Sequence, residues 1–305
     1  MTLPAADGVP VPGSAGDSNK SIGNKSTVGE LLALADQLAA VSDSPELDLQ
    51  LLLARILGCS RARLLAFTEQ TLDQKQQEQF NTDLLRRLRG EPVAYILGSK
   101  AFWDFDLKVD RRVLVPRPET ELLVEKALHC LSDRENQNLQ LLDLGTGSGA
   151  IAIALARQSP CWQVTATDQS EAGLTLAAEN ARQLQVENIE FLTGSWFERL
   201  GTRSFDLIVS NPPYVAAGDP HLQEDGLPFE PADALIAADH GLACLMEIVE
   251  QARRHLKPGS WLLLEHGFDQ AAAVRGKMSD CGYRDIASWQ DLAGLDRVTA
   301  ARFVS

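Results

Sequence analysis

The sequence predicts an α/β protein in which a small helical bundle precedes a doubly wound, mostly parallel sheet. Between residues 27 and about 95, apolar residues recur at the spacing of amphipathic helices. From residue 119 onward, short apolar runs alternate with helical stretches, which is the pattern of a parallel sheet covered by helices. A glycine-rich segment at 145–149 stands where the first of those apolar runs meets a helix.

Composition limits the classes of protein. The chain has 305 residues, 45% of them hydrophobic, which is enough for two domains with separate cores. Its formal net charge is −14, and nonspecific nucleic-acid binding depends on Lys and Arg that neutralise phosphates. Direct nucleic-acid binding is therefore disfavoured, and we interpret the short basic strip at 86–89 as a solvated helix end.

Neither a membrane nor a metal is indicated. No apolar run approaches the roughly 20 residues that span a bilayer, and no signal peptide is recognised, so we expect a cytoplasmic protein. The five cysteines occur singly and the five histidines lack metal-ligand spacing. We expect reduced thiols and no metal site.

The N-terminal third is predicted to contain an extension and a bundle. Residues 1–26 are rich in Gly, Ser and Pro, so we expect a disordered extension. Residues 27–98 are predicted to form four helices. The helix starts are marked by Thr27 (with Glu30 in a capping box), Ser44 before Pro45, Ser60 and Asp73, and stops by Gly58 and Gly90.

A hairpin linker at 99–116 is predicted to follow, because residues alternate between apolar and polar from Ala101 to Val115 and a turn fits at Asp110-Arg111. Residues 117–305 form the third predicted unit. Its predicted strands are 139–144, 163–167, 189–192, 205–209 and 261–264, and its predicted helices are 119–131, 149–158, 170–184, 241–256 and 269–281. In such a sheet, ligands bind at the carboxyl ends of the strands.

The glycine loop, residues 145–149, suits a nucleoside cofactor because its glycines let backbone N–H groups approach a ligand. The spacing of Gly145, Gly147 and Ala150 also fits a dinucleotide site. Asp143 favours S-adenosylmethionine, since a carboxylate there can accept from a cationic α-amino group. Asp168, at the end of the second strand, can accept both ribose hydroxyls of either cofactor.

Two aromatic residues follow the third strand, where an adenine ring would lie. Trp196 or Phe197 can stack on that ring, and a purely core role is the alternative for each.

The acceptor loop, Asn211-Pro212-Pro213-Tyr214, follows the fourth strand and so opens onto the same crevice. Adjacent prolines offer carbonyl acceptors without N–H donors. A planar NH2 group has two donors, so Asn211 Oδ1 and the Pro212 carbonyl can each accept one hydrogen while Tyr214 stacks on the group. The lone pair is then aimed at a methyl donor, and the same acceptors stabilise the positive charge that develops on nitrogen.

A proline- and acid-rich stretch continues to about residue 239, and both a lid and an ordinary surface excursion fit its length.

With both loops in place, residues 28–305 resemble the release-factor glutamine methyltransferases, the HemK/PrmC family. Further motifs that carry the resemblance are Pro116-Arg117-Pro118-Glu119-Thr120-Glu121, Phe229-Glu230-Pro231 and Leu264-Glu265-His266-Gly267. Phe229 is a departure, since tyrosine is common there, and we expect no catalytic consequence.

The resemblance implies a Rossmann-like class I methyltransferase domain at 117–305 and a monomer whose bundle docks the substrate. It implies transfer of methyl from S-adenosylmethionine to N5 of the glutamine in the Gly-Gly-Gln motif of bacterial class I peptide-chain release factors. The implied cofactor-binding residues are Asp143, Gly145, Thr146, Gly147, Ser148, Gly149, Asp168, Trp196 and Asn211. The implied substrate-binding residues are Asn211, Pro212, Pro213 and Tyr214, of which Asn211, Pro212 and Tyr214 are the catalytic ones.

Three alternative functions share parts of the pattern. A DNA adenine N6-methyltransferase shares the planar acceptor, but the acidic charge and lack of a target-recognition domain disfavour it. A dinucleotide-dependent dehydrogenase leaves the acceptor loop without a purpose, and a noncatalytic adaptor does not need every motif intact. Arg117 and Glu119 fit either the entrance to the site or a salt-bridged structural corner.

Overall fold

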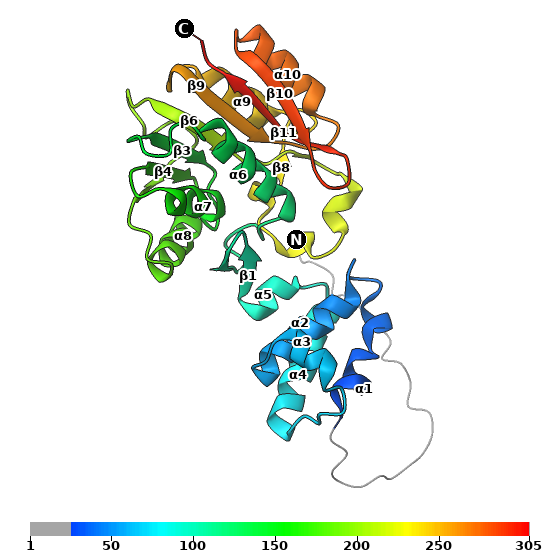
Figure 1. The fold of residues 1–305 in the computed structure, drawn as a ribbon. Coiled ribbons are helices and arrows are strands. Elements are labelled where there is room, and N and C mark those ends of the chain that lie inside the picture. Colours follow the sequence, from blue (N-terminus) through cyan, green and yellow to red (C-terminus); the bar gives the residue numbers. More distant parts are fainter. Residues whose placement is uncertain (1–25, 305) are drawn as a thin grey trace, which may run out of the picture.

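The structure, a computed structural model, describes residues 26–304. Figure 1 shows a helical body at the N-terminal end of the chain and a larger α/β body, with the short strand β1 between them. The extension predicted for residues 1–26 lies, apart from Ser26, outside the described residues. Among those residues, no helix has both the length and the apolar character to cross a membrane.

The helical body has more elements than the four predicted helices. They are α1 (Val28–Leu32), the 3-10 helix η1 (Ala35–Leu38), α2 (Pro45–Leu57), α3 (Arg61–Ala66), α4 (Gln74–Leu88) and α5 (Val93–Leu97). The predicted capping box of Thr27 and Glu30 is present, and the Ser60 and Asp73 side chains accept from backbone N–H groups as N-caps should. Apolar side chains such as Leu49, Leu53 and Phe80 are fully buried and form the core of this body.

Two predictions about this body were wrong in detail. Ser44 precedes α2, but its side chain makes no capping hydrogen bond; its backbone N–H donates to Ser42 Oγ over 3.1 Å. The strip at 86–89 is also not simply a solvated helix end. Arg87 is buried in an ion pair with Asp48, and Arg86 forms two hydrogen bonds of 2.8 Å with the Glu91 carboxylate. Acidic partners therefore neutralise most of the strip.

The hairpin linker is shorter than predicted. Its strands β1 (Ser99–Phe102) and β2 (Phe105–Lys108) are antiparallel, and Trp103 in the turn has a φ of 55°. A turn is present at Asp110-Arg111, where the Val113 N–H donates to the Asp110 carbonyl over 3.1 Å, but it does not connect the two strands of the hairpin as predicted. The alternating pattern continued past β2 because Val109 and Val113 are buried in the core of the larger body without belonging to a strand.

The larger body is a seven-stranded sheet in the order β10-β11-β9-β6-β3-β4-β5, and this confirms the predicted doubly wound fold class. Only β11 runs antiparallel to its neighbours. The strands are β3 (Gln140–Leu144), β4 (Gln163–Asp168), β5 (Ile189–Thr193), β6 (Phe205–Ser210), β9 (Leu256–Glu265), β10 (Arg284–Gln290) and β11 (Asp296–Arg302). The sequence did not predict β10 and β11.

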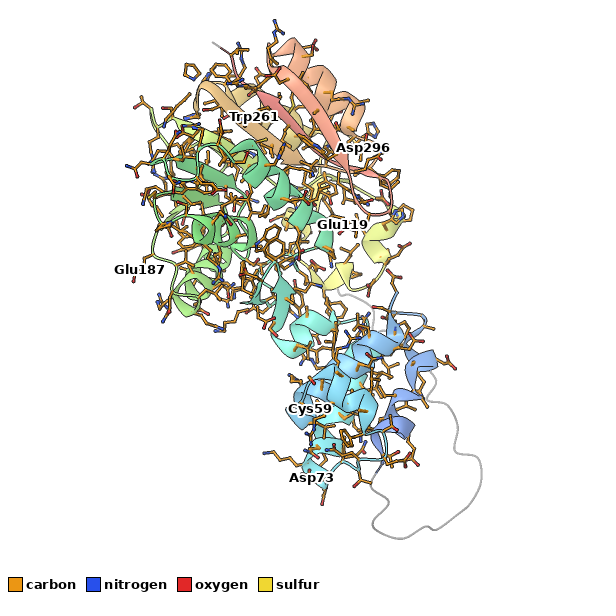
Figure 2. All side chains as sticks on the ribbon, in the orientation of Figure 1. Cys59, Asp73, Glu119, Glu187, Trp261 and Asp296 are labelled. Atoms are coloured by element: carbon orange, nitrogen blue, oxygen red, sulfur yellow. The ribbon has the colours of Figure 1, made fainter. Side chains whose placement is uncertain are left out.

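Helices cover both faces of this sheet, as Figure 1 shows. They are α6 (Pro118–Cys130), α7 (Ala150–Gln158), α8 (Glu171–Gln183), α9 (Ala243–Ala252) and α10 (Ala271–Asp280). Successive residues of a strand point to opposite faces of the sheet, so each strand packs against a helix layer on either side. Leu141 and Leu207 pack with α6, α7 and α8, whereas Leu142 and Ile208 pack with α9 and α10. Figure 2 shows Glu119 at the end of α6 that faces the helical body.

The stretch after the acceptor loop folds back on itself. Strands β7 (Val215–Ala216) and β8 (Ile236–Ala237) pair in parallel at its base. Residues 217–235, which we call the flap, contain the 3-10 helices η2 (Pro220–Gln223), η3 (Leu227–Phe229) and η4 (Ala232–Ala234). The flap reaches the helical body, because Asp225 forms an ion pair with Arg87 over 2.6 Å.

Candidate active site

Two neighbouring parallel strands bring the glycine loop and the acceptor loop together. Leu144 at the end of β3 pairs with Ser210 at the end of β6, so both loops leave the same edge of the sheet. Ser210 Oγ donates to the Leu144 carbonyl over 2.7 Å and fixes the two strand ends to each other. The predicted convergence of the loops therefore follows from strand register.

The glycine loop needs glycines for its backbone. Gly145, Gly147 and Gly149 have φ of 71°, 53° and 85°, in the left-handed region that other residues seldom adopt. Gly145 also lies beside the Trp196 ring, which a Cβ would meet at 3.4 Å. The Gly147 N–H donates to Asp168 Oδ2 over 2.9 Å, so the loop is tied to the end of β4.

Asp143 lies beneath the loop and is fully buried. Its Oδ2 accepts from Thr146 Oγ1 over 2.6 Å and from the Ala152 N–H over 3.2 Å, whereas Oδ1 has no partner among the described residues. Burial raises the pKa of Asp143 to about 7, although the hydrogen bonds from Thr146 and Ala152 act to lower it. An unpaired buried oxygen suits a cationic group, whose charge would stabilise the carboxylate.

A cavity of about 720 Å³ lies over the glycine loop. Its lining includes five of the predicted cofactor-binding residues: Gly145, Gly147, Asp168, Trp196 and Asn211. The other four, Asp143, Thr146, Ser148 and Gly149, are buried and do not line the cavity. They form the base on which the lining residues rest.

The two aromatic candidates have different surroundings. Trp196 is half-buried and lines the cavity. Phe197 is buried and stacks on the His255 ring at 4.9 Å, within the core beneath α9 and α10. Of the two, only Trp196 has a face available to a ligand in this cavity.

A second cavity, of about 310 Å³, lies on the other side of Asn211. Asn211, Pro212 and Tyr214 line it together with residues of the flap and with Asp43 of the helical body. Pro213 instead lines the larger cavity. Asn211 lines both cavities, as do Leu114 and Ala234, so these three residues stand between the two.

Two residues outside the predicted set contact the acceptor loop. Asn211 Nδ2 donates to Thr120 Oγ1 over 3.1 Å, and the Tyr214 hydroxyl donates to Glu265 Oε1 over 3.3 Å. Glu265 is fully buried and its Oε2 has no partner among residues 26–304. Burial raises the pKa of Glu265 to about 7, with hydrogen bonding from Thr120 and Tyr214 acting in the opposite direction.

The backbone of Tyr214 is held from behind. Gln270 Nε2 donates to its carbonyl over 3.0 Å, and Gly241 packs so closely that a Cβ there would lie 2.1 Å from the same oxygen. Gly241 also has a φ of 85°. Only glycine fits this position, and the acceptor loop is therefore fixed on both sides.

The surroundings of Arg117 are compatible with both predicted roles, the entrance to the site and a salt-bridged structural corner. It forms an ion pair with buried Glu230, whose Oε2 also accepts from the Val115 N–H over 2.9 Å, and it lines the smaller cavity. Burial raises the pKa of Glu230, although Arg117 acts to lower it. The ion pair between Arg117 and Glu230 thus joins the motif at 116–121 to the flap.

Two features define the class of the protein: the order of strands in the sheet, and the glycine and acceptor loops that leave the same edge of that sheet. The protein is an S-adenosylmethionine-dependent methyltransferase. Among the described residues no group of His, Cys, Asp and Glu could hold a metal ion. Residues 119–224 match the methyltransferase small domain, and residues 30–98 match the PrmC N-terminal domain.

Curated relatives narrow the class. A release factor glutamine methyltransferase of Coxiella burnetii is 46% identical over 269 residues, which cover 88% of this chain and 96% of the relative. The release factor glutamine methyltransferase of Escherichia coli is 44% identical over 262 residues, covering 86% of this chain and 94% of the relative. A methyltransferase structure from Pyrococcus furiosus, 18% identical, covers 74% of this chain and 98% of its own with a TM-score of 0.50, which supports the fold alone. The chain belongs to the release factor glutamine methyltransferase family.

Proposed function

We propose that this enzyme transfers the methyl group of S-adenosylmethionine to N5 of the glutamine in the Gly-Gly-Gln motif of bacterial class I peptide-chain release factors. The observation that carries the proposal is the position of Asn211 between the larger cavity over the glycine loop and the smaller cavity beside Tyr214. In a chain of this family, that position lets one side chain adjoin both the methyl donor and the acceptor nitrogen.

The larger cavity fits the cofactor. When bound, S-adenosylmethionine supplies an electrophilic methyl group. Asp168 at the end of β4 accepts from the ribose hydroxyls and Trp196 stacks on adenine, which is supported by the presence of both residues in the lining of this cavity. Asp143, buried beneath the loop, organises it through Thr146 and so supports the residues that line the cavity.

The smaller cavity holds the glutamine amide. Asn211 Oδ1 and the Pro212 carbonyl each accept one hydrogen of the NH2 group, while Tyr214 lies against its plane. Because the amide lone pair is delocalised, the enzyme acts by orienting the nitrogen and by stabilising the positive charge that develops on it. The N–C bond forms as the S–C bond to the methyl group breaks, with S-adenosylhomocysteine as the leaving group, and one of the two NH2 protons is then lost to water, so no strong base is needed at the nitrogen before transfer.

We also propose a role for each of the three segments of the chain. Residues 27–98 serve as the docking bundle, 99–116 as the linker and 117–305 as the catalytic domain, and the enzyme works in the cytoplasm. Direct nucleic-acid binding is not part of the proposal. The net charge of −14 and the ion pairs that neutralise Arg86 and Arg87 support its exclusion.

The test is an acceptor assay. Purified enzyme is incubated with radiolabelled S-adenosylmethionine and a class I release factor, and in parallel with the same factor carrying alanine in place of the Gly-Gly-Gln glutamine. We expect label in the first factor and none in the second. Equal labelling of both factors, or of neither, would overturn the proposal, and label in DNA adenine would favour another acceptor.

Replacing Asp168 with alanine is expected to weaken S-adenosylmethionine binding by about 10- to 100-fold, since hydrogen bonds to a charged group contribute about 1.5–3 kcal/mol. The substitution also removes the acceptors of the Gly147 and Ser170 N–H groups. Calorimetric titration with the cofactor measures the change. Exposed Asp269 is a matched control, and its alanine variant should bind as the wild type does. Wild-type affinity in Asp168→Ala would remove Asp168 from the cofactor site.

A further inference from the structure

Three large apolar side chains are exposed at the edge of the sheet from which the acceptor loop leaves. Leu292 and Leu295 lie in the turn between β10 and β11, and Phe268 lies in the loop after β9. Leu292 is fully exposed, Phe268 is 56% exposed and Leu295 is 40% exposed. We call these three side chains the apolar rim.

The direction of the strands places the apolar rim at that edge. Strand β9 runs parallel to β6, and β11 runs antiparallel to both β9 and β10, so β10 is parallel to β6 as well. The segments that follow β9 and β10 therefore leave the sheet where the acceptor loop does. Figure 1 shows the turn between β10 and β11 at the end of this hairpin nearer the helical body.

Pairing between β9 and β11 brings Phe268 and Leu295 together. The ladder continues one residue past β9, because the His266 N–H donates to the Arg297 carbonyl over 2.9 Å. Phe268 is two residues beyond His266, and Leu295 is two residues before Arg297. At equal spacing from that hydrogen bond, the two residues continue the register and leave the ladder side by side.

The turn that carries the two leucines is closed by Asp291. Its N–H donates to the Leu295 carbonyl over 2.9 Å, and its Oδ1 accepts from the Ala293 and Leu295 N–H groups over 2.9 and 3.0 Å. Its Oδ2 accepts from Arg297 Nε over 2.8 Å. These hydrogen bonds fix the turn while Leu292 faces solvent. Because the turn is shaped before a partner arrives, binding to it costs little conformational entropy.

The apolar rim is continuous with the acceptor loop. Gln270, two residues after Phe268, donates from Nε2 to the Tyr214 carbonyl over 3.0 Å, and its Oε1 accepts from the Gly267 N–H over 2.9 Å. The loop after β9 thus holds the backbone of Tyr214 and exposes Phe268. A folded protein that inserts a side chain beside Tyr214 places its own surface against the loops around Tyr214, and the rim belongs to those loops.

We infer that the apolar rim docks an apolar part of the release factor surface next to the Gly-Gly-Gln loop. The inference rests on the proposed function, which takes the acceptor glutamine to belong to a release factor. Exposed apolar side chains that gather in one place, beside a site, mark a protein contact.

A second copy of this chain is a poorer occupant. Specific dimers bury roughly 20–30 residues of each partner, which is far more than two short loops supply. A release factor needs only a supplementary contact at the rim, since its glutamine is also held in the smaller cavity. Such a contact adds affinity without preventing release of the methylated product.

Leu292→Gln and Leu292→Met test polarity apart from size, because the two replacements have nearly the same length. We expect KM for the release factor to rise about 10-fold in Leu292→Gln, and to rise further when Leu295→Gln and Phe268→Gln are added. The value of kcat and the affinity for S-adenosylmethionine should stay those of the wild type. Leu292→Met should keep the wild-type KM. Initial rates over a range of release factor concentrations measure both constants, and an unchanged KM in the triple variant would overturn the inference.

Val304 offers a matched control. Its side chain is 45% exposed, and it follows β11 at the opposite edge of the sheet, because β11 runs antiparallel to β9. Val304→Gln should keep the wild-type KM for the release factor. If it raises KM as much as Leu292→Gln does, the effect is not local to the rim and the inference fails.

The mass of the enzyme in solution tests the other occupant. Light scattering should give the same mass for the wild type and for Leu292→Gln, and a wild-type dimer that dissociates in Leu292→Gln would assign the rim to a second copy instead. The wild type also separates the two proposals. If it does not methylate the release factor, the proposed function fails. If it does, and its KM equals that of the triple variant, the docking surface alone fails.

Discussion

Asn211→Ala is expected to lower the rate of methyl transfer by about two to three orders of magnitude while the cofactor still binds. In the proposed mechanism the substitution removes one of the two oxygens that orient the glutamine NH2 group and stabilise its developing charge, and loss of one such group costs about 10²–10³ in kcat. Gly145, Asp168 and Trp196 still line the larger cavity, so cofactor affinity should change little. Single-turnover labelling of a release factor with radiolabelled cofactor measures the rate.

A second asparagine provides the control. Asn136 is exposed and precedes β3, so it lies toward the edge of the sheet opposite the two loops. Asn136→Ala should label the release factor at the wild-type rate. Undiminished labelling in Asn211→Ala would contradict the proposed mechanism, because no other side-chain amide of the described residues lines both cavities.

Arg87→Met is expected to destabilise the protein by about 3–5 kcal/mol, the usual cost of removing one partner of a buried ion pair. The side chains of Arg87 and Asp48 are 2% and 5% exposed, and Nε donates to Asp48 Oδ2 over 2.6 Å. The methionine would leave the Asp48 carboxylate buried with Ser42 as its remaining hydrogen-bond partner, at 2.7 Å. Urea denaturation followed by circular dichroism measures the loss.

Two further variants test the cause of this loss. Asp225, the other partner of Arg87, has a side chain that is 41% exposed, so Asp225→Asn should shift the urea midpoint far less. Adding Asp48→Asn to Arg87→Met removes the unpaired charge and should restore part of the stability. If the double variant is as unstable as Arg87→Met, the unpaired carboxylate is not the cause.

The parallel part of the sheet could be predicted because its strands are continuous apolar runs. Strand β6, for example, is buried at every residue from Phe205 to Ser210. Strands β10 and β11 could not, because they contain charged and small residues and lack such a run. The hairpin turn was misplaced for a related reason, since Trp103 carries none of the usual turn signals.

The two loops of the site could be predicted because each is a local pattern next to a strand. The contacts that support them could not. Asn211 meets Thr120 across 91 residues, and Arg117 meets Glu230 across 113. Such pairings depend on the order of strands and on the path of the flap, and a single sequence does not specify either through local spacing.

The ion pair between Arg87 and Asp225 has a consequence for how substrate choice is distributed. Asp225 and Asp43 both line the smaller cavity, although Asp43 comes from the helical body and Asp225 from the flap. The helical body is thus a wall of the chamber as well as a platform beside it. On the proposed function, a catalytic domain separated from it would keep its donor pocket yet lose part of the lining of the acceptor cavity, and we therefore propose that the two bodies recognise the acceptor together.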